Sequence, residues 1–85
     1  MKQFTYTIKD ELGIHARPAG MLAKAAKALD SDISITKDGK TAGAAKLMAL
    51  MGLGVKCGDT VTVTIEGGDE AASEKAMREF LEANL

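Results

Sequence analysis

The 85-residue sequence predicts a two-layer α+β fold in which helices cover one side of an antiparallel sheet. Each strand-like segment alternates apolar and polar residues, so one face of the sheet is solvated. Strand and helix patterns follow one another in the order β-α-β-β-α-β-α. No linker, repeat or low-complexity tract divides the chain, so we expect a single domain over residues 1–85.

The first half of the chain predicts a strand, a helix and a hairpin. Residues Lys2–Ile8 alternate aromatic residues and Ile with Thr, as half-buried strands do. Apolar residues recur three and four apart over Ala16–Leu29, which predicts an amphipathic helix. A second strand around Ile33–Ile35 turns at Asp38-Gly39 and returns through Lys40–Gly43. The expected inner face of the helix comprises Ala19, Leu22, Ala23, Ala26 and Leu29.

The second half predicts a short helix, a strand and a final helix. Leu47–Leu53 is apolar almost throughout and too rich in Leu and Met for a strand, and it ends at Gly54. Thr60–Glu66 alternates strictly and gives the clearest strand. Asp69 is a suitable N-cap for the last helix. This pattern leaves the strand order open and also fits a ferredoxin-like fold with one added helix. The expected inner stripe of the last helix comprises Ala72, Ala76, Met77, Phe80 and Leu81.

Composition excludes several classes of protein. Eleven Lys and Arg residues oppose twelve Asp and Glu residues, a formal net charge of −1, so nothing indicates a nucleic-acid partner. No apolar run approaches the ~18 residues of a membrane span, and the N-terminus resembles no export signal. The single cysteine, Cys57, cannot form an internal disulfide and is expected in the core or near the surface. We therefore expect a cytoplasmic protein without membrane insertion.

The single histidine lies at the expected start of the first helix. Pro18 fits only the first helical turn, because it lacks an amide hydrogen. His15 is then at or next to the N-cap, beside the unpaired amides of Ala16 and Arg17 and the Arg17 guanidinium. Such a site could hold a phosphoryl group on the ring. Because the helix dipole disfavours imidazolium, we hypothesise that His15 is substantially neutral near pH 7.

Other interpretations of His15 stay open at this point. A histidine near a helix start is often only a polar capping or surface residue. A metal site is disfavoured, since one His and one Cys lack further ligands at suitable spacing, and no cofactor is expected. A nucleophilic Cys57 served by His15 has no local motif in its favour.

Two helix faces are candidate binding surfaces. Leu47–Leu53 holds five large apolar residues in under two turns, so some of them should be exposed, although a fully buried helix is an equal alternative. Four residues, three of them basic, recur at helical spacing on the outward side of the first helix. An ordinary solvated face would show the same pattern. The four residues are Arg17, Gly20, Lys24 and Lys27.

The motif Gly13-Ile14-His15-Ala16-Arg17-Pro18-Ala19, with the apolar segment downstream and the order of elements, resembles the HPr family over essentially the whole chain. These are the histidine-containing phosphocarriers of the bacterial phosphoenolpyruvate-dependent sugar phosphotransferase system (PTS). The resemblance implies an open-faced β-sandwich with sheet order 1-4-2-3 and three helices on one face. That order replaces the ferredoxin-like alternative.

The resemblance also implies a function. His15 would be phosphorylated on Nδ1 (pros-phosphohistidine) by phosphorylated enzyme I and would pass the group to a histidine of a sugar-specific enzyme IIA. The protein would be a monomeric carrier rather than a turnover enzyme. Ala16 and Arg17 would bind the phosphoryl group. The implied docking surface comprises Gly20, Met21, Lys24, Lys27, Leu47, Met48 and Met51, which leaves Leu50 and Leu53 for the core.

Two residues depart from the pattern of the family. Lys46 stands where many members from low-GC Gram-positive bacteria carry a regulatory serine, so this position cannot accept that phosphate. Leu12 stands where a small polar residue is frequent, and it resembles the nitrogen-related paralogues. A nitrogen-related or other regulatory phosphorelay, and a binding module that works without phosphate, are therefore the alternative functions.

Overall fold

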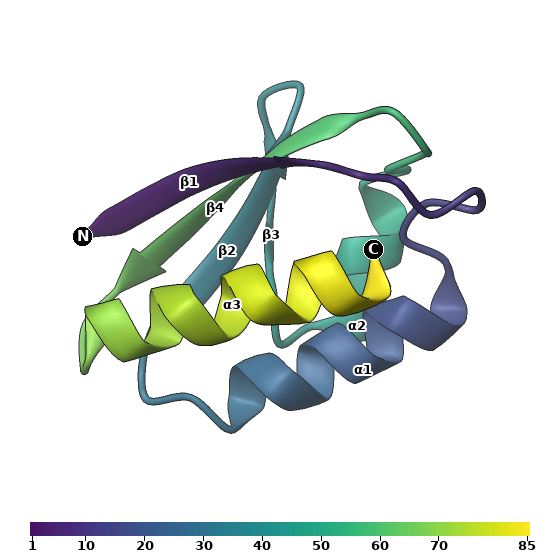
Figure 1. Ribbon diagram of the computed structural model, residues 1–85. Coiled ribbons are helices and arrows are strands. Elements are labelled where there is room, and N and C mark those ends of the chain that lie inside the picture. Colours follow the sequence, from purple (N-terminus) through teal and green to yellow (C-terminus); the bar gives the residue numbers. More distant parts are fainter.

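The computed structural model describes residues 1–85 and contains four strands and three helices. The sheet is antiparallel with the order β1-β4-β2-β3, and the helices lie together on one of its faces (Figure 1). This confirms the predicted fold class and the strand order implied by the resemblance, and it excludes the ferredoxin-like alternative. The elements are β1 Lys2–Thr7, α1 Ala16–Lys27, β2 Asp32–Lys37, β3 Lys40–Gly43, α2 Leu47–Gly52, β4 Thr60–Glu66 and α3 Glu70–Asn84.

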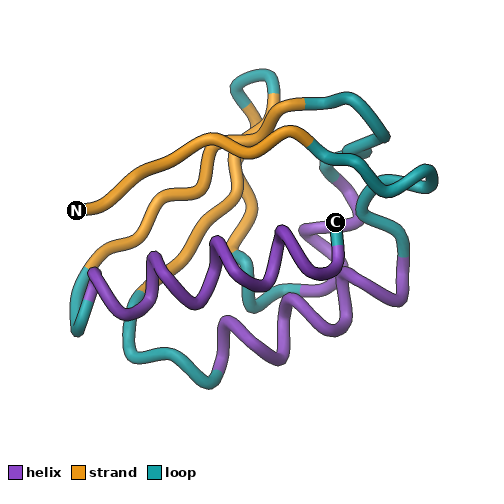
Figure 2. Tube along the Cα trace, in the orientation of Figure 1, coloured by secondary structure: helices purple, strands orange, loops and turns teal.

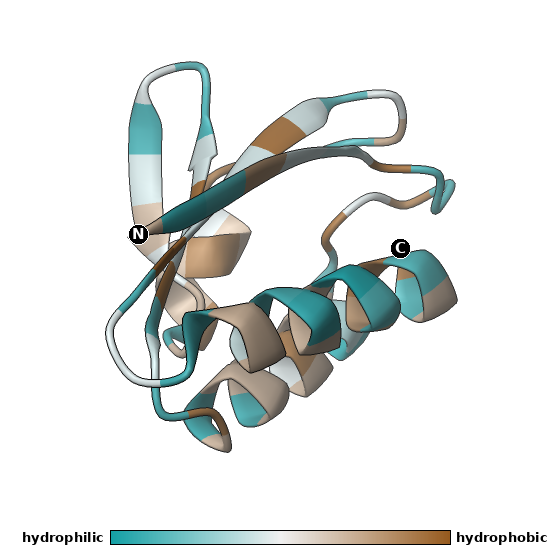
Figure 3. Cartoon of the chain, turned by 60° about the vertical axis from the view of Figure 1, so that its left-hand side comes forward, coloured by the Kyte–Doolittle hydropathy of each residue, from teal (hydrophilic) through white to brown (hydrophobic).

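The core lies between the sheet and the helices because every strand alternates its side chains. Phe4 of β1 is opposite Val63 of β4, which is opposite Ile35 of β2, which in turn is opposite Ala42 of β3. These four side chains are buried in one row across the sheet. The alternation is visible as changing colours along the strands in Figure 3. Burial of this row is the main reason that the register cannot slip by one residue.

The opposite face of the sheet carries threonine. Thr5, Thr62, Thr36 and Thr41 form the corresponding row across the four strands. The hydroxyls of Thr36 and Thr41 lie 2.8 Å apart, within hydrogen-bond distance. Threonine suits this face because its β-branched side chain fits a strand and its hydroxyl remains hydrated.

The helices bury most of the expected inner residues, with departures on both α1 and α3. On α1 all of the expected inner residues are buried except Leu29, which is partly exposed beyond the helix end at Lys27. On α3 the buried positions are Ser73, Met77 and Leu81. Of the other expected inner residues, Ala76 and Phe80 are partly exposed and Ala72 is exposed. The prediction of Ala72 as an inner residue was therefore wrong.

Ser73 can take the buried position because its hydroxyl has a partner. The Ser31 hydroxyl donates to the Gly67 carbonyl at 2.6 Å and lies 2.8 Å from the Ser73 hydroxyl, which can donate to it. A buried hydroxyl without such a partner would cost about 1–3 kcal/mol. The partner comes from the loop before β2, which sequence periodicity on α3 cannot reveal.

Two further expectations concern single features. Cys57 is exposed, near the surface as expected, and its Sγ lies 3.7 Å from the Lys9 carbonyl oxygen. No helix combines the length and the apolar character that crossing a membrane requires.

Candidate functional site

His15 is the N-cap residue of α1, as the position of Pro18 predicts. Its backbone is extended, with φ −92° and ψ −176°, and its carbonyl accepts the first helical hydrogen bond from Ala19 N–H at 3.0 Å. The imidazole makes no capping hydrogen bond, and the side chain is about one-third exposed, at 36%. The ring therefore stands at the helix start and is accessible from solvent.

The first turn of α1 presents free donors beside this ring. The amides of Ala16 and Arg17 donate to no group within the protein, and Pro18 has no amide hydrogen. Unpaired amides at a helix start carry the positive end of the helix dipole. The Arg17 side chain is exposed and adds a guanidinium with five donors. This end of α1 can therefore bind an anion that is attached to the ring.

The loop before His15 is held by a close backbone contact. Ile14 N–H donates to the Val55 carbonyl at 3.1 Å, and the Ile14 side chain is buried. Gly13 has φ +68°, and a Cβ atom there would lie 2.2 Å from the Val55 oxygen. Only glycine fits this approach, so Gly13 fixes the entry of the chain into α1.

The Asp10 carboxylate contacts the imidazole of His15. The sequence alone did not predict this contact. Asp10 Oδ1 lies 3.7 Å from His15 Nε2, and the same oxygen accepts Leu12 N–H at 2.9 Å. The second contact is an Asx turn, in which an Asp side chain accepts the N–H two residues on, so an Asp at the start of a loop is a usable sequence signal. The Asp10 carboxylate and the positive end of the α1 dipole therefore both lie beside the ring.

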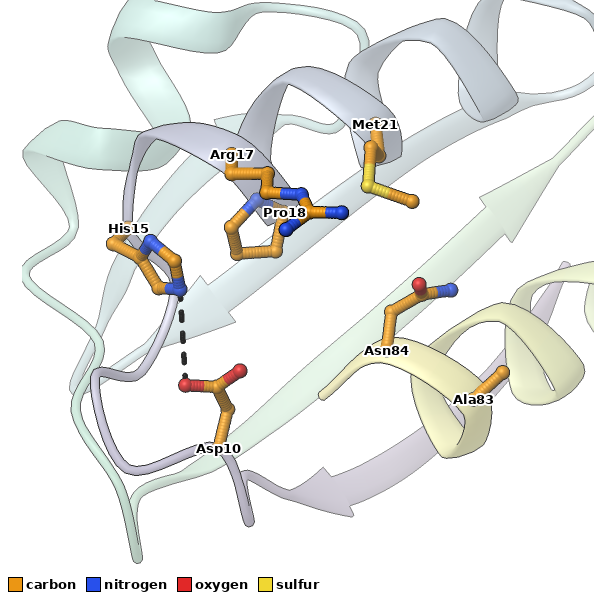
Figure 4. A pocket seen from close by; sticks show the side chains of 7 residues that line it. All are labelled: Asp10, His15, Arg17, Pro18, Met21, Ala83 and Asn84. Atoms are coloured by element: carbon orange, nitrogen blue, oxygen red, sulfur yellow. Dashed lines mark ion pairs between the residues drawn. The ribbon is translucent and has the colours of Figure 1, made fainter.

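These groups line a hollow of about 260 Å³. Figure 4 shows its walls, and Figure 2 shows that the loop before α1 and the C-terminal end of α3 lie at the same end of the molecule. Ala83 and Asn84 of α3 form the wall opposite α1. Sequence reasoning did not include these two residues, because only the folded sheet and helix packing bring them near the histidine. The lining residues are Asp10, His15, Arg17, Pro18, Met21, Ala83 and Asn84.

The short helix α2 places part of its apolar surface outside. Met48 is 78% exposed, whereas Leu50 and Leu53 are buried, as expected from the resemblance. Met21 of α1 is also exposed, and α1 packs beside α2. Lys24 and Lys27 are exposed on α1, and Gly20 is partly exposed. We call the set Gly20, Met21, Lys24, Lys27, Leu47, Met48 and Met51 the α1–α2 surface.

The two departures from the family pattern are both exposed. Lys46 is the N-cap residue of α2 and makes no side-chain cap hydrogen bond. The Leu12 side chain is 71% exposed, and only its backbone N–H takes part in the loop, through Asp10. No group of three or more His, Cys, Asp or Glu side chains could hold a metal ion.

An open α+β sandwich with an exposed histidine at a helix start defines the class of histidine phosphocarrier domains. The family model PTS-HPr, described as the PTS HPr component phosphorylation site, matches residues 2–83. The chain belongs to the HPr family. It is therefore assigned to the phosphocarriers of the PTS, which are not catalytic enzymes.

Solved structures agree with this assignment. HPr-C-His from Thermoanaerobacter tengcongensis is 38% identical with a TM-score of 0.92, covering 98% of this chain and 93% of that chain. A phosphocarrier protein HPr from Bacillus anthracis strain Ames is 32% identical with a TM-score of 0.87, covering 94% and 95%. The catabolite repression protein Crh from Bacillus subtilis is 30% identical with a TM-score of 0.77, covering 100% and 98%, and forms a swapped dimer.

Proposed function

We propose that residues 1–85 act as one cytoplasmic phosphocarrier domain. His15 accepts a phosphoryl group from phosphorylated enzyme I and passes it to a histidine of a sugar-specific enzyme IIA. The observation that supports this proposal most is the accessible imidazole beside the free amides of Ala16 and Arg17. A residue with a purely structural capping role would direct its side chain to those amides, and His15 does not.

The surroundings of the ring suit a carrier that must pass its phosphoryl group on. The amides of Ala16 and Arg17 and the Arg17 guanidinium offset the negative charge of a phosphoryl group. Each contribution at a helix start is typically about 0.3–1 kcal/mol. Much stronger stabilisation of the phosphorylated state would slow onward transfer unless the transition state were stabilised equally.

The α1–α2 surface is the proposed docking site for both partners. Its centre is apolar, with Met48 most exposed, and Lys24 and Lys27 provide a basic rim. Methionine adapts to surfaces of different shape, which one site for two partners requires. The basic rim favours fast, transient association with acidic proteins.

A regulatory phosphorelay is the second candidate function. The match to Crh, named for catabolite repression, favours it, and so does the exposed Leu12 beside the site. Lys46 argues against regulation by phosphorylation at that position, because its side chain cannot accept a phosphoryl group on oxygen. A binding module that works without phosphate does not need a nucleophilic His15 beside the anion-binding Arg17. This third function is therefore the least supported by the site.

We also propose that the protein acts as a monomer. HPr-C-His matches with a TM-score of 0.92, whereas the HPr dimer from the same organism matches with 0.76. The fold therefore agrees better with the first of these structures. Sedimentation at the concentration used for transfer assays tests the oligomeric state, and a dimer would contradict this part of the proposal.

Intact-mass analysis after incubation with phosphoenolpyruvate and enzyme I tests the function. The wild type should gain one acid-labile phosphoryl group, and His15→Ala should gain none. Arg17→Ala should be phosphorylated more slowly, since it loses the guanidinium but keeps the amide donors. An unmodified wild type beside a reference carrier that the same enzyme I phosphorylates would refute the proposal.

A further inference from the structure

Asp10 is the one carboxylate that contacts the imidazole of His15. We propose that Asp10 is a positioning residue, which holds the ring proton on Nε2 and so makes Nδ1 the nitrogen that accepts and releases the phosphoryl group. The proposal rests on the proposed function of His15 as phosphoryl acceptor. It goes further because it assigns the choice between the two ring nitrogens to a particular side chain.

The geometry of Asp10 is fixed before any phosphate arrives. Its Oδ1 accepts Leu12 N–H at 2.9 Å, and its own N–H donates to the Leu85 carbonyl at 2.9 Å. Both the side chain and the backbone of Asp10 are therefore held in place. A carboxylate that is itself held by hydrogen bonds orients its partner better than a mobile surface carboxylate does.

The two ring nitrogens have different surroundings. Nε2 faces Asp10, on the side of the ring away from α1, as Figure 4 shows. Nδ1 makes no hydrogen bond to the protein. A neutral imidazole has one N–H and one lone pair, and a carboxylate can only accept a proton donor. Asp10 therefore favours the form with the proton on Nε2 and the lone pair on Nδ1.

No other side chain contacts the ring in this way. Arg17 has only donors, and the Asn84 amide, whose Nδ2 donates to the Phe80 carbonyl at 2.9 Å, makes no hydrogen bond to the imidazole. Glu11 follows Asp10 directly but its side chain is exposed and contacts nothing around His15. The separation of 3.7 Å is an ion-pair distance rather than a hydrogen bond, and contacts of this kind often tighten as charge develops.

The arrangement gives a transfer in which no proton has to move. The Nδ1 lone pair attacks the phosphorus of the donor, the N–P bond to His15 forms, and the bond from phosphorus to the donor breaks with its electron pair leaving on the donor. Nε2 keeps its proton, so the phosphorylated ring is cationic and the Asp10 carboxylate balances that charge. When an acceptor nitrogen attacks the phosphorus, the electron pair of the broken N–P bond returns to Nδ1. The ring is then neutral again with its proton on Nε2.

The first measurement uses the unphosphorylated protein. Nitrogen-15 NMR of the neutral His15 ring reports the ratio of the Nε2–H form to the Nδ1–H form. We compare the wild type with Asp10→Asn, which keeps an oxygen for Leu12 N–H but loses the charge, and with Glu11→Gln as the matched loss of one charge. Asp10→Asn should lower the ratio about threefold, in keeping with a partly exposed ion pair, and Glu11→Gln should leave it unchanged.

The second measurement uses phosphoramidate as a donor, which requires no partner protein. Phosphorus-31 NMR gives the ratio of Nδ1-linked to Nε2-linked phosphohistidine. This ratio should fall about threefold in Asp10→Asn and stay unchanged in Glu11→Gln. The Leu12 amide signal checks that the turn persists in the variant.

The outcomes separate this inference from the proposed function. Equal tautomer and product ratios in the wild type and Asp10→Asn would overturn the positioning role, even where His15 is phosphorylated normally. A tautomer ratio that depends on Asp10 supports the positioning role, even in a wild type that enzyme I does not phosphorylate. That second result would refute the proposed function alone.

Discussion

At the scale of single residues, Lys37 joins two segments that are distant in sequence. Its Nζ lies 2.9 Å from Asp59 Oδ2 and 3.0 Å from the Gly54 carbonyl oxygen, and the side chain is only 17% exposed. Asp59 Oδ2 also accepts Lys56 N–H at 2.8 Å. The contacts of Lys37 and Lys56 hold the pKa of the Asp59 carboxyl below its usual value. These contacts hold the end of β2 against the single loop between α2 and β4.

The sign of this pKa shift gives a prediction for pH-dependent stability. Because the carboxyl has a lower pKa in the folded state, its stabilising effect is complete above the unfolded pKa and disappears as pH falls through the folded pKa. Lys37→Met should lower the thermal midpoint at pH 7, and the difference from wild type should shrink in acid. Thermal unfolding followed by circular dichroism from pH 7 to about 2.5 measures this.

Lys40→Met is the matched control, because Lys40 is opposite Lys37 in the same hairpin and has no ion pair. Its thermal midpoint should stay near that of the wild type across this range. A Lys37→Met deficit that is as large in acid as at neutral pH would show that lost packing, rather than the ion pair, is responsible.

A second prediction at this scale concerns two glycines with similar backbone geometry. Gly13 and Gly54 have φ +68° and +65°, but only at Gly13 would a Cβ atom overlap another group, the Val55 carbonyl. Gly54→Ala should cost about 1–2 kcal/mol from backbone strain. Gly13→Ala should cost about 2–5 kcal/mol, because the overlap adds about 1–3 kcal/mol to the backbone strain. Urea unfolding of the two variants measures the difference, and equal losses would contradict the close approach at Gly13.

At the scale of elements, α2 combines a buried side and an exposed side within six residues, Leu47–Gly52. Leu50 is fully buried and Met48 is 78% exposed. Leu50→Ala should therefore lower the free energy of unfolding by about 2–4 kcal/mol. Met48→Ala should change it by less than about 0.5 kcal/mol. Chemical denaturation of both variants tests this assignment of the two sides, and a large loss in Met48→Ala would reverse it.

The elements themselves were predictable because their signals are local. The alternation in Thr60–Glu66 and the first-turn preference of Pro18 each depend on neighbouring residues alone. Ser73 was not predictable, because its burial depends on the hydroxyl of Ser31, 42 residues away. Periodicity cannot identify a buried polar residue whose partner lies in another segment.

The same distinction applies to the site. His15, Ala16 and Arg17 follow from the helix start, which is a local feature. Asp10 reaches His15 only because the backbone contact of Ile14 with Val55 and the tight approach at Gly13 fold the loop back. The exposed side of α2 came from the resemblance, since the apolar pattern alone fits either orientation.

At the scale of the whole molecule, charge is distributed unevenly although the net charge is only −1. Exposed cations of α1 border the apolar part of the α1–α2 surface, while α3 carries four of the twelve acidic residues, Glu70, Glu74, Glu79 and Glu82. Long-range steering depends on the local potential rather than on the sum of charges. The local positive potential of α1 can therefore steer association with an acidic surface even though the whole protein is nearly neutral.

This arrangement predicts how association depends on salt and on the position of charge. Reversing Lys24 and Lys27 to Glu should slow association with phosphorylated enzyme I about tenfold at low ionic strength. The difference from wild type should narrow above about 0.1 M salt, where the Debye length falls to about 10 Å. Stopped-flow phosphoryl transfer over a salt series measures both effects.

The double reversal of Lys40 and Lys75 is the matched control. It changes the net charge by the same amount, but Lys40 lies in the hairpin strand β3 and Lys75 on α3, outside the α1–α2 surface. Because screening and distance weaken charges outside the contact, this variant should associate nearly as fast as the wild type. If both double variants slowed association equally, net charge rather than the basic rim would govern the encounter, and the assignment of Lys24 and Lys27 to the docking site would fail.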